Sequence, residues 1–147
     1  MKKVIIFVIA FVMVLSSMGI VFASDEPAFE EANAGTVTPS WVGLNTITQD
    51  FQILSGGMAN PIIRGTTYAS QVDYVNVVVS LKKGSGTSWT TIKTWNQNIT
   101  ISLNKFTFNQ TYAVSPGYSY KYSTTVKSYK NNVLVDSVSL NSNALVY

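Results

Sequence analysis

The sequence predicts an all-β protein, built as a two-sheet antiparallel sandwich of about seven strands. The first observation is the run 118–129, in which aromatic or apolar side chains alternate with polar ones. A period of two over that length is typical of a strand with one face in a core and one in water. Turn residues also recur after roughly every dozen residues, and no segment shows a sustained helical period.

The first 23 residues have the three parts of a secretory signal peptide. Met1-Lys2-Lys3 is cationic, residues 4–22 are mostly apolar, and Val21-Phe22-Ala23 offers small residues to a signal peptidase. We therefore expect cleavage after Ala23 and a secreted chain. The alternative is a retained anchor, because 19 mostly apolar residues can span a bilayer. We prefer cleavage because no basic stop-transfer cluster follows, so we expect membrane contact only through an uncleaved segment.

Residues 24–40 differ in composition from the rest of the chain. They hold four of its seven acidic residues, among mostly Ala, Gly, Pro and Thr, with no clear periodicity. We expect a flexible acidic leader here, followed by a single β-domain over 41–147. From Trp41 onward the chain has eight basic residues and three acidic ones, so the net charge of the domain is +5 (8 − 3). The chain has no cysteine, so the domain depends on its core alone.

The expected strands are each bounded by turn residues. They are 44–54, 58–67, 71–83, 88–96, 99–114, 117–129 and 133–147. Within 71–83, four alternating aliphatic residues predict the most regular buried face. Pro61 marks the second strand as an edge or irregular strand. In the fifth strand the apolar positions change from odd numbers, such as Ile101, to even ones, such as Phe106. We expect a β-bulge near Asn104-Lys105 to reconcile them.

The last hairpin turns at Lys130-Asn131-Asn132, and the loop length decides which side chains face the core. A two-residue Asn-Asn loop would expose Val138 and Leu140, whereas a three-residue loop places Val138 opposite Thr124 inside. Because a one-residue slip turns every side chain over, we predict the three-residue loop with a bulge. That register leaves Asp136 on the inner side opposite Val126, a position that suits a carboxylate only near the rim.

The segment Val114-Ser-Pro-Gly-Tyr-Ser-Tyr120 resembles the tyrosine corner of fibronectin type III and immunoglobulin-like sandwiches. The resemblance implies an immunoglobulin-like or fibronectin-like sandwich, in which the Tyr120 hydroxyl hydrogen-bonds to the upstream backbone. The immunoglobulin cysteines are absent. In length and pattern the chain also resembles small secreted proteins of Gram-positive bacteria, a resemblance that implies no particular activity.

The composition argues against an enzyme. With no histidine and no cysteine, zinc sites built on those ligands and histidine-based triads are excluded. No glycine-rich phosphate loop is present, and the carboxylates are too sparse for a calcium site. We therefore expect no catalytic residue, no metal, no cofactor and no nucleic-acid partner. A glycoside hydrolase is the weaker alternative, since it would need two of Asp50, Asp73 and Asp136 in one cleft.

One outer sheet face is the candidate for ligand binding. Strands 71–83, 88–96, 117–129 and 133–147 are expected to share a sheet. Parity assigns to its outer face Tyr74, Asn76, Lys82, Lys121, Lys127 and Tyr129. If Ile92 points inward, the same face gains Trp89, Lys93 and Trp95. The alternative is that at least one of these tryptophans is a core residue.

No carboxylate of the domain is assigned to this face, so its chemistry suits an anionic polymer or a glycan. The plainer interpretation is that its lysines keep an exposed sheet soluble. We expect a secreted, non-enzymatic binding or structural module of the bacterial cell envelope. The alternative function is a secreted antagonist that is bacteriocin-like or directed at a host. The sequence carries no signal for an oligomeric state.

Overall fold

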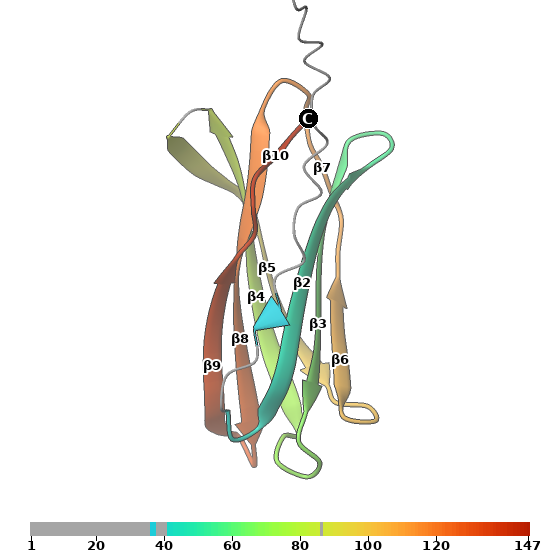
Figure 1. Ribbon diagram of the computed structural model, residues 1–147, viewed down its shortest axis with the longest axis vertical. Helices are drawn as coiled ribbons and strands as arrows, with labels where there is room; N and C mark the ends of the chain where they lie inside the picture. Colours follow the sequence, from blue (N-terminus) through green and yellow to red (C-terminus); the bar gives the residue numbers. More distant parts are fainter. Residues whose placement is uncertain (1–35, 38–40, 86) are drawn as a thin grey trace, which may run out of the picture.

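The computed structural model describes residues 36–37, 41–85 and 87–147 (Figure 1). Within them the chain forms two antiparallel sheets packed against each other, and the secondary structure is entirely β, which confirms the predicted sandwich. The expected signal peptide, residues 1–23, lies outside the described residues. So does most of the expected leader, except the short strand β1 (Thr36–Val37). No helix among the described residues is long and apolar enough to cross a membrane.

The described residues contain ten strands, and seven of them have five residues or more. The sequence also predicts seven strands. Sheet A contains β1, β2 (Leu44–Leu54), β3 (Met58–Thr67), β6 (Lys105–Asn109) and β7 (Tyr112–Ala113). Sheet B contains β4 (Tyr74–Ser85), β5 (Ser88–Thr100), β8 (Ser119–Lys130), β9 (Val133–Asn141) and β10 (Leu145–Val146). In sheet A the order is β1-β2-β3-β6, with β7 also paired to β3. In sheet B the order is β10-β8-β4-β5, with β9 also paired to β8, so the four strands expected in one sheet do share it.

The core lies between the sheets and follows the alternation of β4 and β8. Val75, Val77, Val79 and Leu81 of β4 are fully buried. The even residues of β8 from Tyr120 to Ser128 are also buried. Sheet A supplies the opposite layer, with Leu44, Ile47, Phe51, Ala59, Ile63, Phe106 and Phe108. Burying this apolar surface is the main stabilising contribution to the fold.

The tyrosine corner has the expected hydrogen bond. The Tyr120 hydroxyl donates to the Ser115 carbonyl oxygen at 2.7 Å, and the Ser115 amide lies 3.2 Å from the same hydroxyl. Gly117 supplies the positive φ of 85° that the entry into β8 requires. Tyr118 was expected on the core face with Tyr120, but its side chain is 39% exposed because it precedes the paired part of the strand.

The expected strand 99–114 is wrong, because the chain changes sheets within it. Ile99 and Thr100 end β5 in sheet B, and β6 begins at Lys105 in sheet A. Between them Leu103 and Asn104 form a tight turn with positive φ values of 49° and 59°. The apolar positions change parity because the core lies on the opposite side of the second sheet, so no bulge at Asn104-Lys105 is needed.

The predicted three-residue loop of the last hairpin is also wrong. The prediction that Val138 and Leu140 face the core is nevertheless correct. Asn131-Asn132 is a two-residue turn with φ values of 49° and 63°. A register shift beside Ser128 adds one residue to β9, which turns the later side chains back toward the core. Val138 therefore lies opposite Val126, and Leu140 lies opposite Thr124, each two residues from its predicted partner along β8.

Asp136 lies inward opposite Ser128 and not opposite Val126. Its carboxylate accepts hydrogen bonds from three backbone amides just before and at the start of β2, those of Val42, Gly43 and Leu44, at 3.2, 2.8 and 2.9 Å. These bonds tie β9 of sheet B to β2 of sheet A. The carboxylate is therefore used to hold the two sheets together at their rim.

Candidate functional site

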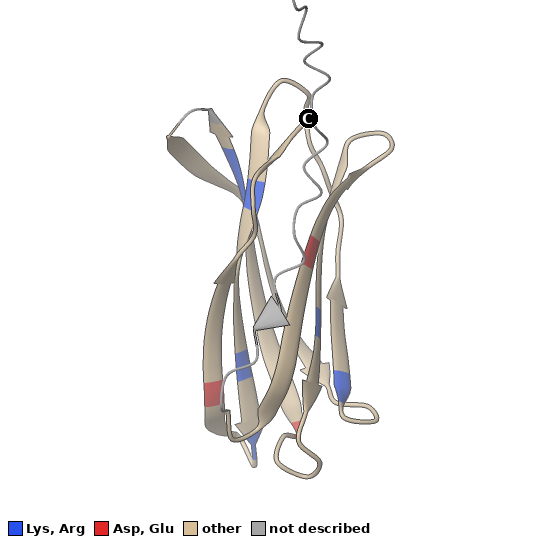
Figure 2. Cartoon of the chain, viewed as in Figure 1, with Lys and Arg blue, Asp and Glu red and all other residues tan. Residues whose placement is uncertain are grey.

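The outer face of sheet B is formed by the outward residues of β4, β5, β8 and β9. The cross-strand register places Lys82 opposite Lys121, Asn76 opposite Lys127, and Tyr74 opposite Tyr129. None of the outward residues of these strands is Asp or Glu. In Figure 2 the three acidic positions lie on β2, on β9 and beside the start of β4. The one on β9 is the inward Asp136.

One end of this face combines an aromatic stack with a row of amides. The rings of Tyr74 and Tyr129 are nearly parallel, with their centroids 4.9 Å apart and an interplanar angle of 7°. Beside them the side-chain nitrogen of Asn76 donates to the side-chain oxygens of Asn96 and Asn98, both at 2.7 Å. These bonds hold the three amides in place on the sheet surface. Aromatic faces and fixed amides are groups that can contact a sugar by stacking and hydrogen bonding.

The other end of the face concentrates positive charge. Lys82 and Lys121 lie directly opposite each other, a like-charge pair that is unfavourable in a sheet. The Lys121 ammonium lies 4.1 Å from the centre of the Trp89 ring, a cation–π contact that offsets part of this cost. The Trp89 ring lies against Gly84, where an added Cβ would come within 2.6 Å of a ring carbon. A glycine is therefore required for the ring to reach this position.

The lysines of this face have no described carboxylate partner. The only salt bridge among the described residues joins Lys130 to Asp73, at 2.7 Å. The Asp73 carboxylate also accepts a hydrogen bond from the backbone of Asn131 at 2.7 Å, and these two bonds lower the pKa of Asp73. The pair lies where β8 ends and β4 begins, outside the row formed by Lys82, Lys121 and Lys127.

The outward placement of Lys93 and Trp95 is wrong. A bulge leaves Ile92 unpaired, because Leu81 lies opposite Lys93 while Lys82 lies opposite Thr91. The bulge turns Lys93 and Trp95 to the inner side of β5. The Trp95 ring packs edge-on against Phe108 and Tyr112, with centroids 6.1 and 6.4 Å away. The Lys93 ammonium lies 5.8 Å from the Trp95 ring and 5.9 Å from the Tyr112 ring, at the side of the sandwich.

The other candidate residues, namely Tyr74, Lys82, Trp89, Lys121, Lys127 and Tyr129, do share the outer face. Sequence reasoning missed the amide row, because β5 was expected to end at Asn96 and in fact continues to Thr100. The polar run Asn96-Gln97-Asn98 could have indicated an exposed strand end. The register that joins Asn98 to Asn76 is visible only in the fold.

The three aspartates of the domain occupy different places. Asp50 lies on the outer face of sheet A and accepts a hydrogen bond from Gln52 at 2.7 Å. Asp73 is paired with Lys130 at the end of sheet B, and Asp136 is bonded to backbone amides at the rim. The described residues contain no group of three His, Cys, Asp or Glu side chains that could hold a metal ion.

Sequence comparisons find no protein-family model and no curated protein that matches this chain. The functional inference therefore depends on the residues of the outer face of sheet B themselves.

Proposed function

We propose that this chain is a secreted, non-enzymatic binding module of a bacterial cell envelope, and that the outer face of sheet B binds an anionic polymer or glycan. The observation that carries the proposal is the composition of that face. It combines three lysines, a stacked tyrosine pair, an outward tryptophan and a row of amides, without a carboxylate. Lysines attract an anionic chain over a long range, and aromatic rings and amides provide contacts at short range.

The pairing of Lys82 with Lys121 supports an anionic ligand in particular. Their opposition costs free energy in the unbound sheet. An anionic group placed between the two ammonium groups removes that repulsion and gains attraction to both. Because the sheet fixes both positions in advance, little further ordering of the backbone accompanies binding.

The spacing of the lysines supports a polymer and not a single ion or sugar. Lys121 and Lys127 are six residues apart on β8, which corresponds to roughly 20 Å at the rise of an extended strand. A ligand that contacts both ends of the face must span that distance. We therefore expect affinity to rise with the length of an anionic oligomer until both ends are engaged.

Two further features support the rest of the proposal. Each domain aspartate is already engaged by a neighbouring group, which suits structural roles and not a catalytic pair. The Tyr120 hydrogen bond, together with the sheet orders β2-β3-β6 and β8-β4-β5, supports a sandwich of the fibronectin type III or immunoglobulin-like kind. Such sandwiches commonly serve as binding modules at cell surfaces.

The test is co-sedimentation of the purified chain with isolated Gram-positive cell walls across a salt series. We expect binding at low ionic strength that weakens steeply as salt screens the lysines. Lys121→Glu combined with Lys127→Glu should abolish sedimentation while leaving thermal unfolding nearly unchanged, because both side chains are at the surface.

A matched control is Lys83→Glu combined with Lys93→Glu. This variant has the same net charge as the first one, but its substitutions lie outside the outward row of sheet B. It should retain most of the binding. The absence of wall binding at low salt, or equal losses in the two double variants, would show that the face is only a solvated surface.

A further inference from the structure

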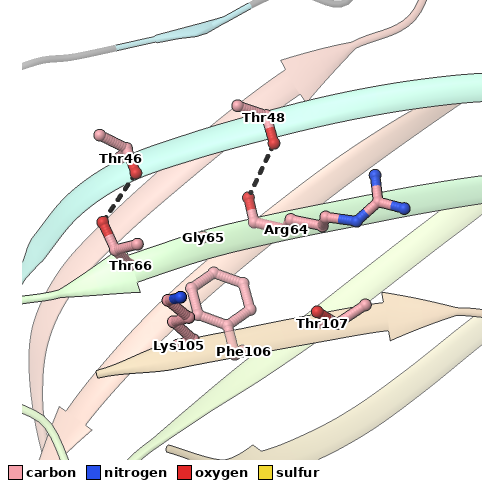
Figure 3. Close-up of a pocket in the computed structure, with 8 residues that line it drawn as sticks. All are labelled: Thr46, Thr48, Arg64, Gly65, Thr66, Lys105, Phe106 and Thr107. Carbon is pink, nitrogen blue, oxygen red and sulfur yellow. Dashed lines mark hydrogen bonds between the residues drawn. The ribbon is translucent and has the colours of Figure 1, made fainter. Parts of the chain in front are cut away.

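We propose that the outer face of sheet A, on the other side of the sandwich, carries a separate site for a tetrahedral oxyanion such as a phosphate or sulfate ester group. This inference goes beyond the proposed function and does not depend on it. The site is a shallow pocket of about 170 Å³ across β2, β3 and β6 (Figure 3). The residues that give it its chemistry are Arg64, Lys105 and the threonines Thr46, Thr48, Thr66 and Thr107.

The register of sheet A brings these side chains together from three strands. On the central strand, Arg64 lies between Thr48 and Thr107, and Thr66 lies between Thr46 and Lys105. Figure 3 shows Lys105 at the Thr66 end of the pocket and Arg64 at the Thr48 end. Arg64 and Lys105 are diagonal neighbours across adjacent strands, a relation with a separation of roughly 7–8 Å. In Figure 3 the exposed Arg64 side chain extends away from Lys105. An anion that contacts both charges therefore requires the Arg64 side chain to turn back over Gly65.

The hydroxyl groups add donors beside the two charges. The hydroxyls of Thr46 and Thr66 are 2.7 Å apart, and one of them donates to the other. Each hydroxyl has a single hydrogen, so the second member of the pair keeps its own for an incoming acceptor. Within the described part of the chain, the Thr48 hydroxyl makes only a long bond of 3.4 Å to the Arg64 carbonyl oxygen. The hydroxyls, the Lys105 ammonium and the Arg64 guanidinium together offer more hydrogen-bond donors than the two oxygens of a carboxylate can accept in good geometry. This number of donors favours a phosphate or a sulfate.

The backbone at Gly65 forms the floor of the pocket. Gly65 has no side chain, and its inner side is filled by the Phe106 ring, since an added Cβ would lie 2.3 Å from two ring carbons. The described carboxylate on this face, Asp50, lies farther along β2 and accepts a hydrogen bond from Gln52, away from the pocket. Among the described residues neither Arg64 nor Lys105 forms a salt bridge.

The site is tested by nuclear magnetic resonance titration of the full purified chain with inorganic phosphate, inorganic sulfate and acetate, at constant ionic strength. We expect saturable shifts of the amides of residues 46, 48, 64–66 and 105–107, with dissociation constants on the order of millimolar for phosphate and sulfate. Acetate should bind at least several-fold more weakly. Shifts no larger than those caused by chloride, or shifts spread equally over every lysine, would overturn the proposal.

Single variants separate a built site from general charge attraction. Arg64→Gln and Lys105→Gln should each weaken phosphate binding by about fivefold or more, the loss expected for a charge-assisted hydrogen bond. Arg64→Lys should lose part of the affinity, because lysine keeps the charge without the planar fork. Lys83→Gln removes one positive charge elsewhere and should leave the titration unchanged. Equal weakening by Lys83→Gln and Lys105→Gln would contradict the site.

The two faces can be distinguished in the same set of proteins. Lys121→Glu with Lys127→Glu should leave the phosphate shifts at residues 64–66 intact, even where cell-wall binding is lost. A short linear polyphosphate that binds more tightly than inorganic phosphate would identify an extended phosphate ester as the ligand class, and tighter binding of a sulfated oligosaccharide would identify a sulfate ester. No gain with either over the free ions would limit the site to single ions and contradict an ester ligand.

Discussion

Strands β5 and β8 lie in the same sheet and have 13 and 12 residues, but they relate differently to their sequences. β8 pairs with β4 on one side and with β9 and β10 on the other, and its even residues from Tyr120 to Ser128 are all buried. Among the described strands β5 pairs with β4 alone, and it contains the bulge at Ile92. The predicted faces are correct along β8 and fail in the middle of β5.

The difference has a physical cause in the number of neighbours. An extra residue in β8 would break hydrogen-bond ladders on two sides and would turn Tyr122 and Val126 into water. In an edge strand the same insertion disturbs a single ladder, and the strand bends outward to absorb it. The alternation of a sequence therefore predicts the faces of interior strands more reliably than those of edge strands.

The largest effect should come from truncating the interior strand. Tyr122 is fully buried, and its ring packs edge-on against that of Phe51, with the ring centroids 5.3 Å apart. Its hydroxyl donates a hydrogen bond to the Asp50 carbonyl oxygen at 3.1 Å. Tyr122→Ala should lower the free energy of unfolding by roughly 3–5 kcal/mol, as expected for deletion of a buried aromatic side chain. Chemical denaturation measures this value. A loss below about 1 kcal/mol would mean that the interior strand is not the rigid centre of the core.

The two tryptophans of β5 should differ, because the bulge at Ile92 lies between them. Trp95→Ala should cost on the order of 2 kcal/mol, since its half-buried ring packs against Phe108 and Tyr112. Trp89→Ala should cost less than about 1 kcal/mol, because its ring lies on the outer face. Denaturation of both variants tests the bulge. Equal, small losses for the two variants would restore the unbroken alternation that the sequence predicts, in which both rings lie on the outer face.

The two faces of β8 can be compared at adjacent residues. Tyr120→Phe should lower the free energy of unfolding by roughly 1 kcal/mol. The change removes the hydroxyl that is hydrogen-bonded to Ser115, so the Ser115 backbone loses a hydrogen-bond partner. Lys121→Ala should change the stability by no more than about 0.5 kcal/mol, because this side chain points outward. Thermal unfolding of both variants provides the measurement. A larger loss for Lys121→Ala than for Tyr120→Phe would show that the faces are reversed.

The turns after the two strands offer a smaller test. The β8–β9 turn uses Asn131-Asn132, whereas the β5–β6 turn places Leu103 at a φ of 49° with its side chain 91% exposed. Leucine is strained in the left-handed region, and asparagine tolerates it. Leu103→Asn should therefore stabilise the domain by about 0.5–1 kcal/mol, as measured by denaturation. Destabilisation would indicate that the Leu103 side chain has a contact that offsets the strain.

The smallest effect concerns the end of β8, where Lys130 pairs with Asp73. The pKa of Asp73 lies below its ordinary 3.8, first because of the Lys130 hydrogen bond and then because of the Asn131 amide. A carboxyl whose pKa is lowered in the folded state stabilises the fold above its unfolded pKa, and this contribution is lost as the pH falls through the lowered value. Lys130→Gln should therefore reduce the loss of stability as the pH falls below 3.8. An unchanged acid profile would show that the pair does not contribute.

The sequence by itself determined the local features of this protein. The alternation in β4 and β8 fixed their buried faces, and the resemblance of residues 114–120 to a tyrosine corner implied the hydrogen bond of Tyr120. The bounds of β2 and β3 also match the prediction, because glycines and a polar loop delimit both strands. Seven of the nine residues that parity assigns to the ligand face lie on it. The shared sheet of β4, β5, β8 and β9 follows from the expected type of sandwich.

The tertiary structure decided everything that depends on a neighbouring strand. The crossing at Leu103-Asn104, the bulge at Ile92 and the turn at Asn131-Asn132 each set a register, and a register is a property of two strands. The threonines around Arg64 are likewise ordinary surface residues in the sequence. They form a pocket only because three strands place them side by side, and sequence alone does not state which strands will be neighbours.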